Sequence, residues 1–262
     1  MKDSLGDRMK EYENVTRLKL SGRSYTIIRC DGKAFHSYVK GLEKPFDDGL
    51  INDMDETAIY LCKNIMGAKF AFVQSDEISI LLTDFEEIAT QAWFDNNLQK
   101  MCSVSASMAT AKFNSLRTAR FANPVDAWGK DLKNYFSQKL AEFDSRVFQI
   151  PQKTEVMNYL VWRQQDTTRN SIQSVAQSLY SQKELHGKNS DQLQEMIFQK
   201  GTNWNDYSAK YKRGRVIVKE QYTKQPELPT ETSTVRTRWV SIEPPIFTQD
   251  KEFLDTLIPN NN

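Results

Sequence analysis

Short apolar runs alternate with segments of helical spacing through the first half of the chain. The runs predict four strands, at residues 25–30, 68–73, 78–82 and 143–150. Apolar residues that recur every three or four positions predict a charged amphipathic helix over residues 4–20 and mostly helical structure over residues 86–118. Another helix is expected between a cap at Asp47 and a closing glycine at Gly67. The order β-α-β-β-α-β predicts an α+β fold of the ferredoxin-like type, an antiparallel sheet with helices on one face.

The second half of the chain returns to helical spacing and then to short strand-like pieces. The helices are expected at residues 153–183 and 190–199, and the strands at residues 215–219 and 237–242. A proline-containing loop at residues 225–231 separates these strands. We therefore expect a first region at residues 1–151 and a mostly helical second region at residues 152–262, packed as one unit.

Charge is nearly balanced over the 262 residues, with 35 Lys and Arg against 34 Asp and Glu. Net charge by itself therefore does not indicate a nucleic-acid partner. Between residues 151 and 220, however, 11 basic residues outnumber 7 acidic ones, and residues 207–219 contain no acid. A basic second half beside an acidic site fits a polyanionic partner, although a solvated surface is the simpler explanation of the charges alone.

Hydrophobic content and cysteine usage are typical of a cytoplasmic protein. Hydrophobic residues make up 39% of the chain, which supports a sizeable core. The three cysteines, Cys30, Cys62 and Cys102, fit no metal-binding spacing, and Cys30 and Cys62 are expected to be reduced core residues. No apolar run approaches the roughly 20 residues that span a bilayer, and the first residues lack the apolar segment of a secretory signal. We therefore expect no membrane partner.

Two acidic segments carry the candidate chemistry. Asp31 ends the first strand and precedes Gly32, while Asp76 and Glu77 stand between the second and third strands. Because the first and third strands of a ferredoxin-like sheet are antiparallel neighbours, Asp31 and Asp76 are expected to meet at one sheet edge. With the carbonyl of Gly32, they can offer hard oxygen ligands to two Mg²⁺ ions about 4 Å apart that hold a nucleoside triphosphate. Taken singly, each segment is a weak signal, because most Asp-Gly pairs are turns and acids in a hairpin turn are usually solvated.

Six motifs occur in one order between about residue 29 and residue 214. They are Arg29-Cys30-Asp31-Gly32-Lys33-Ala34-Phe35-His36, Lys44-Pro45-Phe46-Asp47, Gln74-Ser75-Asp76-Glu77, Phe143-Asp144-Ser145-Arg146-Val147, Trp162-Arg163-Gln164-Gln165-Asp166 followed by Asn170, and Tyr211-Lys212-Arg213-Gly214. In these motifs the chain resembles the tRNA-His guanylyltransferase family.

The resemblance implies a polymerase-type palm in residues 1–151 and an unusual reaction. Members of the family add nucleotides to the 5′ end of tRNA, so that the chain grows in the 3′→5′ direction. ATP first activates the 5′-monophosphate end. The 3′-hydroxyl of an incoming nucleotide then attacks that activated end.

The resemblance also assigns residues to roles. Asp31 and Asp76 would bind both metal ions, the carbonyl of Gly32 would bind one of them, and Glu77 would support the carboxylates as a third catalytic acid. The bound nucleotide would be ATP, GTP or another triphosphate. The residues that would line its binding site are Gly32, Lys33, Ala34, Phe35, His36, Lys44, Asp47, Ser75 and Asp76. The implied partner is tRNA, and the implied assembly is a homotetramer.

Candidate tRNA contacts lie in the second region. By pattern alone Arg163 and Arg169 are surface charges, and the resemblance makes Arg163 a contact for tRNA or triphosphate. Basic side chains there are expected to bind backbone phosphates, which positions RNA without reading its sequence. The expected set is Arg163, Arg169, Asn170, Lys200, Lys212, Arg213 and Arg215.

Two departures from the family pattern bear on the choice of tRNA. Residues 168–174 read Thr-Arg-Asn-Ser-Ile-Gln-Ser where the eukaryotic enzymes carry His-Ile-Asn-Asn-Leu-Tyr-Asn, and Asn96-Asn97 replaces a basic pair. Both resemble the bacterial and archaeal guanylyltransferase-like branch, which implies template-dependent repair of 5′-truncated tRNA. The alternative is an enzyme dedicated to adding the extra 5′ G of tRNA-His. More distant alternatives are a nucleotide cyclase-type enzyme and a catalytically silent RNA-binding module.

Overall fold

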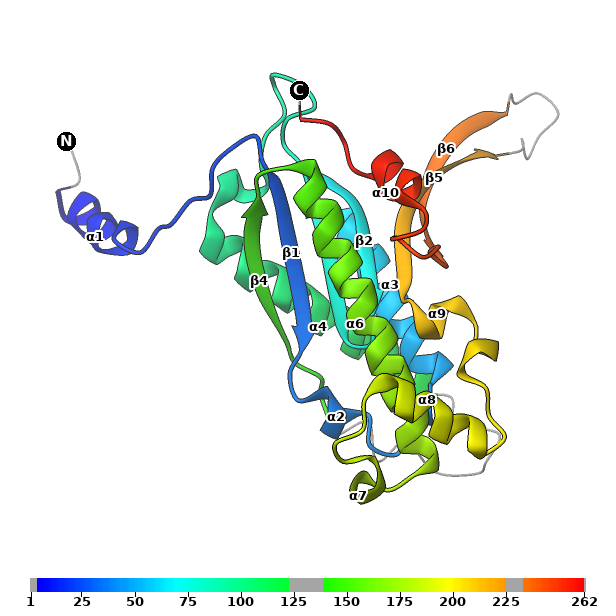
Figure 1. Cartoon of the computed structure of the whole chain (residues 1–262). Coiled ribbons are helices and arrows are strands. Elements are labelled where there is room, and N and C mark those ends of the chain that lie inside the picture. Colours follow the sequence, from blue (N-terminus) through cyan, green and yellow to red (C-terminus); the bar gives the residue numbers. More distant parts are fainter. Residues whose placement is uncertain (1–3, 123–138, 225–232, 262) are drawn as a thin grey trace.

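A six-stranded antiparallel sheet in the order β4-β1-β3-β2-β5-β6 is the frame of the molecule (Figure 1). The structure is a computed structural model that describes residues 4–122, 139–224 and 233–261. The strands are β1 (Tyr25–Gly32), β2 (Ala68–Gln74), β3 (Glu77–Leu82), β4 (Phe143–Ile150), β5 (Arg215–Lys224) and β6 (Thr234–Ile242). The first four follow the spatial order 4-1-3-2 of a ferredoxin-like sheet, so the predicted α+β fold is confirmed.

One face of the sheet is covered by α3 (Asp48–Asn64) and α4 (Leu98–Ala122). Alternate residues of a strand point to opposite faces, so Ile28 of β1 and Ile80 of β3 both point toward these helices. The buried residues of this core include Ile28, Ile80, Met54, Leu61 and Phe113. The middle strands read as continuous apolar runs because their other face is also covered.

The second face is covered by α6 (Lys153–Leu179) and α10 (Lys251–Leu257), which lie in front of the sheet in Figure 1. Its buried core includes Ile27, Phe72, Leu81, Val156 and Leu254. The expectation of helices on one face is therefore incomplete, because the second half of the chain supplies a layer for the other face. The remaining helices are α1 (Ser4–Asn14), α2 (Phe35–Tyr38), α7 (Gln182–Leu185), α8 (Ser190–Gln199) and α9 (Ala209–Lys212), with 3-10 turns at Trp93–Asn96 and Trp204–Asp206.

Helix starts follow their capping residues. The Asp47 carboxylate accepts the Leu50 N–H at 2.7 Å, so the predicted cap of α3 is confirmed. The helix expected over residues 86–118 instead begins at Leu98, where the Asn97 side chain accepts the Lys100 N–H at 3.0 Å. The first helix is also shorter than expected, because it ends at Asn14 and Lys19 then forms a β-bridge with Asn97.

The last two strands are longer than the sequence predicts. β5 has 10 residues and β6 has 9, and their ribbon extends well away from the body of the molecule (Figure 1). The loop expected at residues 225–231 lies outside the described residues. None of the helices in the described ranges combines the length and hydropathy needed to cross a bilayer.

A buried ion pair joins the two helices of the first face. Asp53 of α3 lies 3.0 Å from Arg117 and 2.7 Å from Arg120 of α4, and Arg117 is 3% exposed. Removing one partner of a buried pair leaves the other charge uncompensated, which costs about 3–5 kcal/mol. We expect Asp53→Ala to lower the free energy of unfolding by about that amount in urea denaturation. The matched control Glu56→Ala, at an exposed position of the same helix, is expected to change it by less than about 0.5 kcal/mol.

Candidate active site

The pairing of β1 with β3 brings the two acidic segments together. Asp31 is the register partner of Glu77, and the Gly32 N–H donates to the Asp76 carbonyl oxygen at 3.1 Å. The hairpin between β2 and β3 closes over Ser75 and Asp76, since Gln74 pairs with Glu77. The expected approach of Asp31 and Asp76 at one sheet edge is therefore present in the structure.

Two non-glycine residues in left-handed backbone conformations flank the acids. Ser75, in the hairpin turn, has φ 45°, and Ala34, just before α2, has φ 51°. Such a conformation costs an L-residue on the order of 1–2 kcal/mol, and it tends to persist where function requires a particular backbone path. The backbone on both sides of the acid pair therefore adopts conformations that L-residues do not intrinsically favour.

Gly32 lies where no side chain fits. A Cβ at this position would lie 2.2 Å from the Phe35 ring and 2.9 Å from Oδ2 of Asp76. A side chain at this position would therefore collide with the Phe35 ring and with the Asp76 carboxylate, so glycine lets the backbone pass close to that carboxylate.

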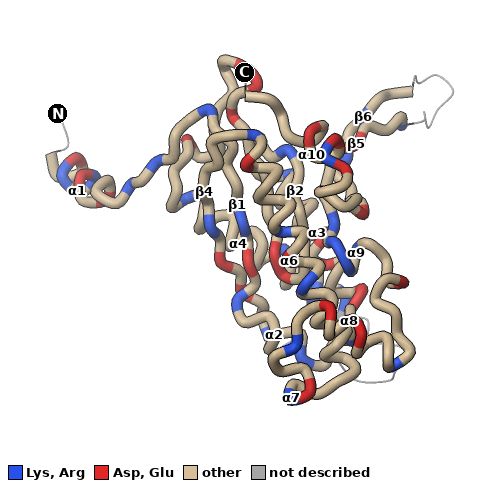
Figure 2. The backbone as a smooth tube through the Cα atoms, in the orientation of Figure 1, with Lys and Arg blue, Asp and Glu red and all other residues tan. Residues whose placement is uncertain are grey.

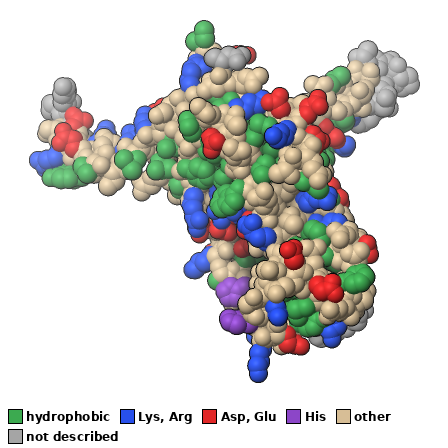
Figure 3. All heavy atoms as spheres, in the orientation of Figure 1, with side chains coloured by type: hydrophobic (Ala, Val, Ile, Leu, Met, Phe, Trp, Pro, Cys, Tyr) green, Lys and Arg blue, Asp and Glu red, His purple; other side chains and the backbone are tan. Residues whose placement is uncertain are grey.

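The neighbours of Gly32 divide between core and surface. Phe35 is buried in an aromatic cluster with Phe113 and Phe143, so only its main chain can face a ligand. Lys33 is exposed and pairs with Glu142 at 2.5 Å. His36 is also exposed, and the histidine side chains appear on the surface beside α2 and α7 (Figure 3).

Negative charge accumulates at Asp76, and no basic side chain in the described part of the chain forms an ion pair with it. The pKa of the Asp76 carboxyl is raised to about 6, mainly by burial and also by the nearby charges of Asp31 and Glu77, while hydrogen bonding from Ser75 opposes the rise. A carboxylate whose charged form is disfavoured in this way is suited to bind a cation, which relieves the repulsion.

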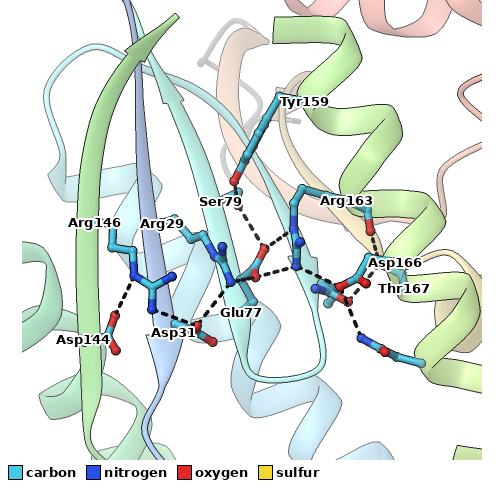
Figure 4. Close-up of polar contacts among 12 residues, drawn as sticks. Arg29, Asp31, Glu77, Ser79, Asp144, Arg146, Tyr159, Arg163, Asp166 and Thr167 are labelled. Carbon is cyan, nitrogen blue, oxygen red and sulfur yellow. Dashed lines mark hydrogen bonds and ion pairs between the residues drawn. The ribbon is translucent and has the colours of Figure 1, made fainter. Parts of the chain in front are cut away.

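Glu77 differs from Asp76 because two arginines neutralise it (Figure 4). Its carboxylate, 3% exposed, accepts from Arg163 at 2.8 and 2.7 Å and lies 2.7 Å from Arg29. Ser79 also donates to it at 3.3 Å, and the Ser79 hydroxyl contacts the Tyr159 hydroxyl at 2.8 Å. Burial raises the pKa of the Glu77 carboxyl, and the guanidinium groups of Arg163 and Arg29 oppose that rise.

A cavity of about 260 Å³ opens beside the hairpin turn. Three residues predicted to bind nucleotide line it: Lys44, Asp47 and Ser75. Phe46 and Tyr211 also line it, and their rings stack with centroids 4.6 Å apart. This places an apolar, aromatic wall next to the acid pair.

Polar residues of α6 form another part of the cavity lining. They are Thr167, Asn170, Ser171, Ser174 and Gln177, of which the sequence analysis selected only Asn170. Their spacing of three or four residues is the signal that could have found them, because it places them on one helical face. That stripe was missed because polar residues at helical spacing usually mark a solvated face.

Comparison with known proteins places these features in a family. The family model described as tRNAHis guanylyltransferase matches residues 6–151, more than half of the chain. The chain belongs to this family. Among curated relatives, a probable tRNA(His) guanylyltransferase of Dictyostelium discoideum is 28% identical, with 75% of each chain covered. An uncharacterised protein of Acanthamoeba polyphaga mimivirus is 27% identical over 98% of this chain and 88% of its own.

Solved structures of the family share the fold. A bacterial tRNA(His) guanylyltransferase-like protein in complex with ATP has a TM-score of 0.83 and 44% identity, covering 98% of this chain and 99% of its own. The tRNA(His) guanylyltransferase of Saccharomyces cerevisiae has a TM-score of 0.64 and 26% identity, covering 80% of this chain and 91% of its own. The chain is thus a nucleotidyltransferase of the tRNAHis guanylyltransferase family.

Three of the expected tRNA contacts are not on the surface. Arg163 is 4% exposed and bound to Glu77, Arg215 is 4% exposed and bound to Asp55 at 2.8 Å, and Lys212 is 7% exposed with its Nζ 2.5 Å from a carbonyl. Each charge is already engaged inside the protein, so Arg163 is not the surface charge that the pattern alone predicts. That these three residues contact tRNA stays a prediction.

The other expected tRNA contacts remain accessible. Arg169, Asn170 and Lys200 are exposed, and Arg213 is partly exposed. Figure 2 shows acidic and basic positions interspersed over the C-terminal helices, so the basic excess of this region does not form a single uninterrupted face. That these four residues contact tRNA stays a prediction.

The raised pKa of Asp76 makes a prediction about stability. With a folded-state pKa of about 6 against an ordinary 3.8, the ionised carboxylate destabilises the fold; the penalty is absent below pH 4 and complete above pH 6. In the presence of EDTA, Asp76→Asn is therefore expected to raise the free energy of unfolding at pH 7.5 by up to about 2–3 kcal/mol. The gain should disappear at pH 4, as measured by urea denaturation at both pH values.

Asp144→Asn, an exposed position on β4, is the matched control and is expected to shift stability by less than about 0.5 kcal/mol. Equal stability of Asp76→Asn and wild type at pH 7.5 would contradict the buried, unneutralised charge.

Proposed function

We propose that the protein is a metal-dependent, template-dependent 3′–5′ nucleotidyltransferase that repairs 5′-truncated tRNA. The observation that carries the proposal is the approach of Asp31 and Asp76 around Gly32, beside a cavity whose lining includes Lys44, Asp47 and Ser75, three of the residues expected to bind nucleotide. Identity favours the repair branch, since the bacterial guanylyltransferase-like protein is 44% identical and the named eukaryotic relatives are 26–28% identical.

The residues present fit Mg²⁺. Among the described residues, no group of three His, Cys, Asp or Glu side chains is placed to hold a metal ion. The proposed donors are therefore the carboxylates of Asp31 and Asp76 and the backbone oxygen of Gly32. Mg²⁺ prefers oxygen ligands and keeps water and phosphate in its octahedral shell, so two carboxylates suffice. The bound ions would polarise the phosphoryl oxygens and lower the pKa of the attacking hydroxyl.

The nucleotide would lie between the β1–α2 turn and the cavity. Ala34 adopts a left-handed conformation just before α2, and the N–H groups of such a turn can form the kind of backbone concavity that holds phosphates. Lys44 would add a positive charge, and the cavity with Phe46 and Tyr211 would hold the base. ATP and GTP stand in the complexes of the bacterial relatives, which supports nucleoside triphosphates as the substrates.

The chain's own residues would contribute orientation rather than a covalent nucleophile. After ATP activates the 5′-monophosphate, the 3′-hydroxyl of the incoming nucleotide must lie in line with the activated phosphate. Holding both ends in one geometry is worth several kcal/mol of the barrier. Arg169, Asn170, Lys200 and Arg213 would position tRNA phosphates, and a homotetramer is the assembly expected from the family.

Addition of the single extra G of tRNA-His is the second candidate, supported by the eukaryotic relatives that bear that name. The Asn96-Asn97 pair, which was expected to distinguish the guanylyltransferase-like branch from the eukaryotic enzymes, has a structural role as well. Both side chains are buried; Asn97 caps α4, and Asn96 donates to the Ser21 carbonyl at 3.1 Å.

The test is incorporation of α-labelled nucleotides onto 5′-truncated tRNA with Mg²⁺. We expect the nucleotide complementary to the template base to be added, since repair follows the template. Asp31→Asn and Asp76→Asn are expected to lower the rate on the order of 10³-fold or more while circular dichroism stays unchanged. The control Glu56→Ala should keep the wild-type rate.

The outcomes separate the candidates. Addition of only G, and only to tRNA-His, would replace repair with the dedicated activity. A small product formed without RNA would indicate a cyclase-type enzyme. Equal activity of wild type and both Asp variants would refute the metal-site assignment, and RNA binding without any nucleotide transfer would indicate a silent module.

A further inference from the structure

Both oxygens of the Glu77 carboxylate are already engaged. Oε1 accepts from Arg163 Nε at 2.8 Å and from Ser79 at 3.3 Å. Oε2 lies 2.7 Å from Arg163 Nη2 and 2.7 Å from Arg29 Nη2. A carboxylate paired in this way by two arginines has no oxygen to offer a cation unless the network breaks.

Arg29 connects Glu77 to Asp31. The same Nη2 atom lies 2.7 Å from Oε2 of Glu77 and 3.2 Å from Oδ2 of Asp31 (Figure 4). Arg146 approaches that same Oδ2 atom at 3.9 Å. Both contacts fall on Oδ2, and no residue in the described part of the chain binds Oδ1 of Asp31.

We propose that Arg163, Glu77 and Arg29 form a positioning relay for Asp31. Arg163 fixes Glu77, Glu77 fixes Arg29, and Arg29 holds Oδ2 of Asp31 so that Oδ1 is presented to the cation. The inference rests on the proposed function only in taking a divalent cation as the ligand of Asp31. It gives the expected supporting role of Glu77 a physical path, and it assigns Arg163 to orientation in place of RNA contact.

The relay begins on the helix that lines the cavity. Arg163 Nη2 also lies 3.3 Å from Asp166, which accepts from Asn170 at 3.4 Å, and Asn170 faces the cavity. The position of α6 therefore bears on both the nucleotide cavity and the metal-binding carboxylate. Residues that orient metal ligands in this way typically change metal affinity or activity 10–100-fold when removed.

The sign of one measurement distinguishes the relay from simple electrostatics. Removing a positive charge near a cation site should strengthen cation binding by Coulomb's law. The relay predicts the opposite, since Asp31 loses its fixed orientation. We expect Arg163→Met to weaken Mn²⁺ binding about tenfold, as measured by the electron paramagnetic resonance signal of free Mn²⁺ without tRNA or nucleotide.

Gln165→Met, an exposed position of the same helix, is the matched control and should bind Mn²⁺ within twofold of wild type. Arg29→Met is expected to match Arg163→Met, and the double variant should be no worse than either, because both act through one chain of contacts. If Arg163→Met does not fold, the partly exposed Arg29→Met carries the same test.

Unchanged or tighter Mn²⁺ binding in the folded arginine variants would overturn the relay. Loss of Mn²⁺ binding in Glu77→Gln but not in the arginine variants would also overturn it, by making Glu77 a ligand itself. A wild-type protein that binds no Mn²⁺ would remove both the relay and the proposed metal site. If only the relay is wrong, the proposed nucleotide transfer still stands, because the incorporation assay tests that transfer separately.

Discussion

The antiparallel pairing of β1 with β3 is the constraint on which the site depends. It sets Asp31 opposite Glu77 and brings Gly32 to the backbone of Asp76. Side chains alternate between faces, so a slip of one residue would turn Arg29 and Asp31 away from α6 and break the contact between Arg29 and Glu77. The apolar partners on the opposite face, such as Ile28 and Ile80, prevent that slip by filling the core under α3 and α4.

Charge at this edge is arranged in two different ways. Glu77 is neutralised by two guanidinium groups and acts as part of the scaffold, whereas Asp76 has neighbouring acids and an elevated pKa. The paired Glu77 stabilises the arrangement of the strands and helix, and the unneutralised negative charge at Asp76 is available to bind a cation. A site of this kind trades stability for function, since its unneutralised carboxylate opposes folding.

Helix α6 has three roles that meet in one segment. It buries Val156 and Leu160 against the sheet, it lines the cavity with Thr167 and the residues that follow, and it supplies Arg163 to Glu77. The C-terminal half of the chain also shares the sheet of the first half, because β5 pairs with β2.

The sequence by itself determined the first four strands, the cap at Asp47 and the meeting of Asp31 with Asp76. These depend on local signals, since apolar runs, capping residues and the order of elements are all written along the chain. Only the tertiary structure decided that Arg163, Lys212 and Arg215 are buried, that a second helical layer covers the sheet, and that β5 and β6 extend as a long ribbon. A basic residue is exposed unless a partner meets it, and for Arg163 that partner, Glu77, is 86 positions away in the chain. Helical spacing shows which face of a helix is apolar but not which surface that face covers, so the role of α6 emerged only from packing.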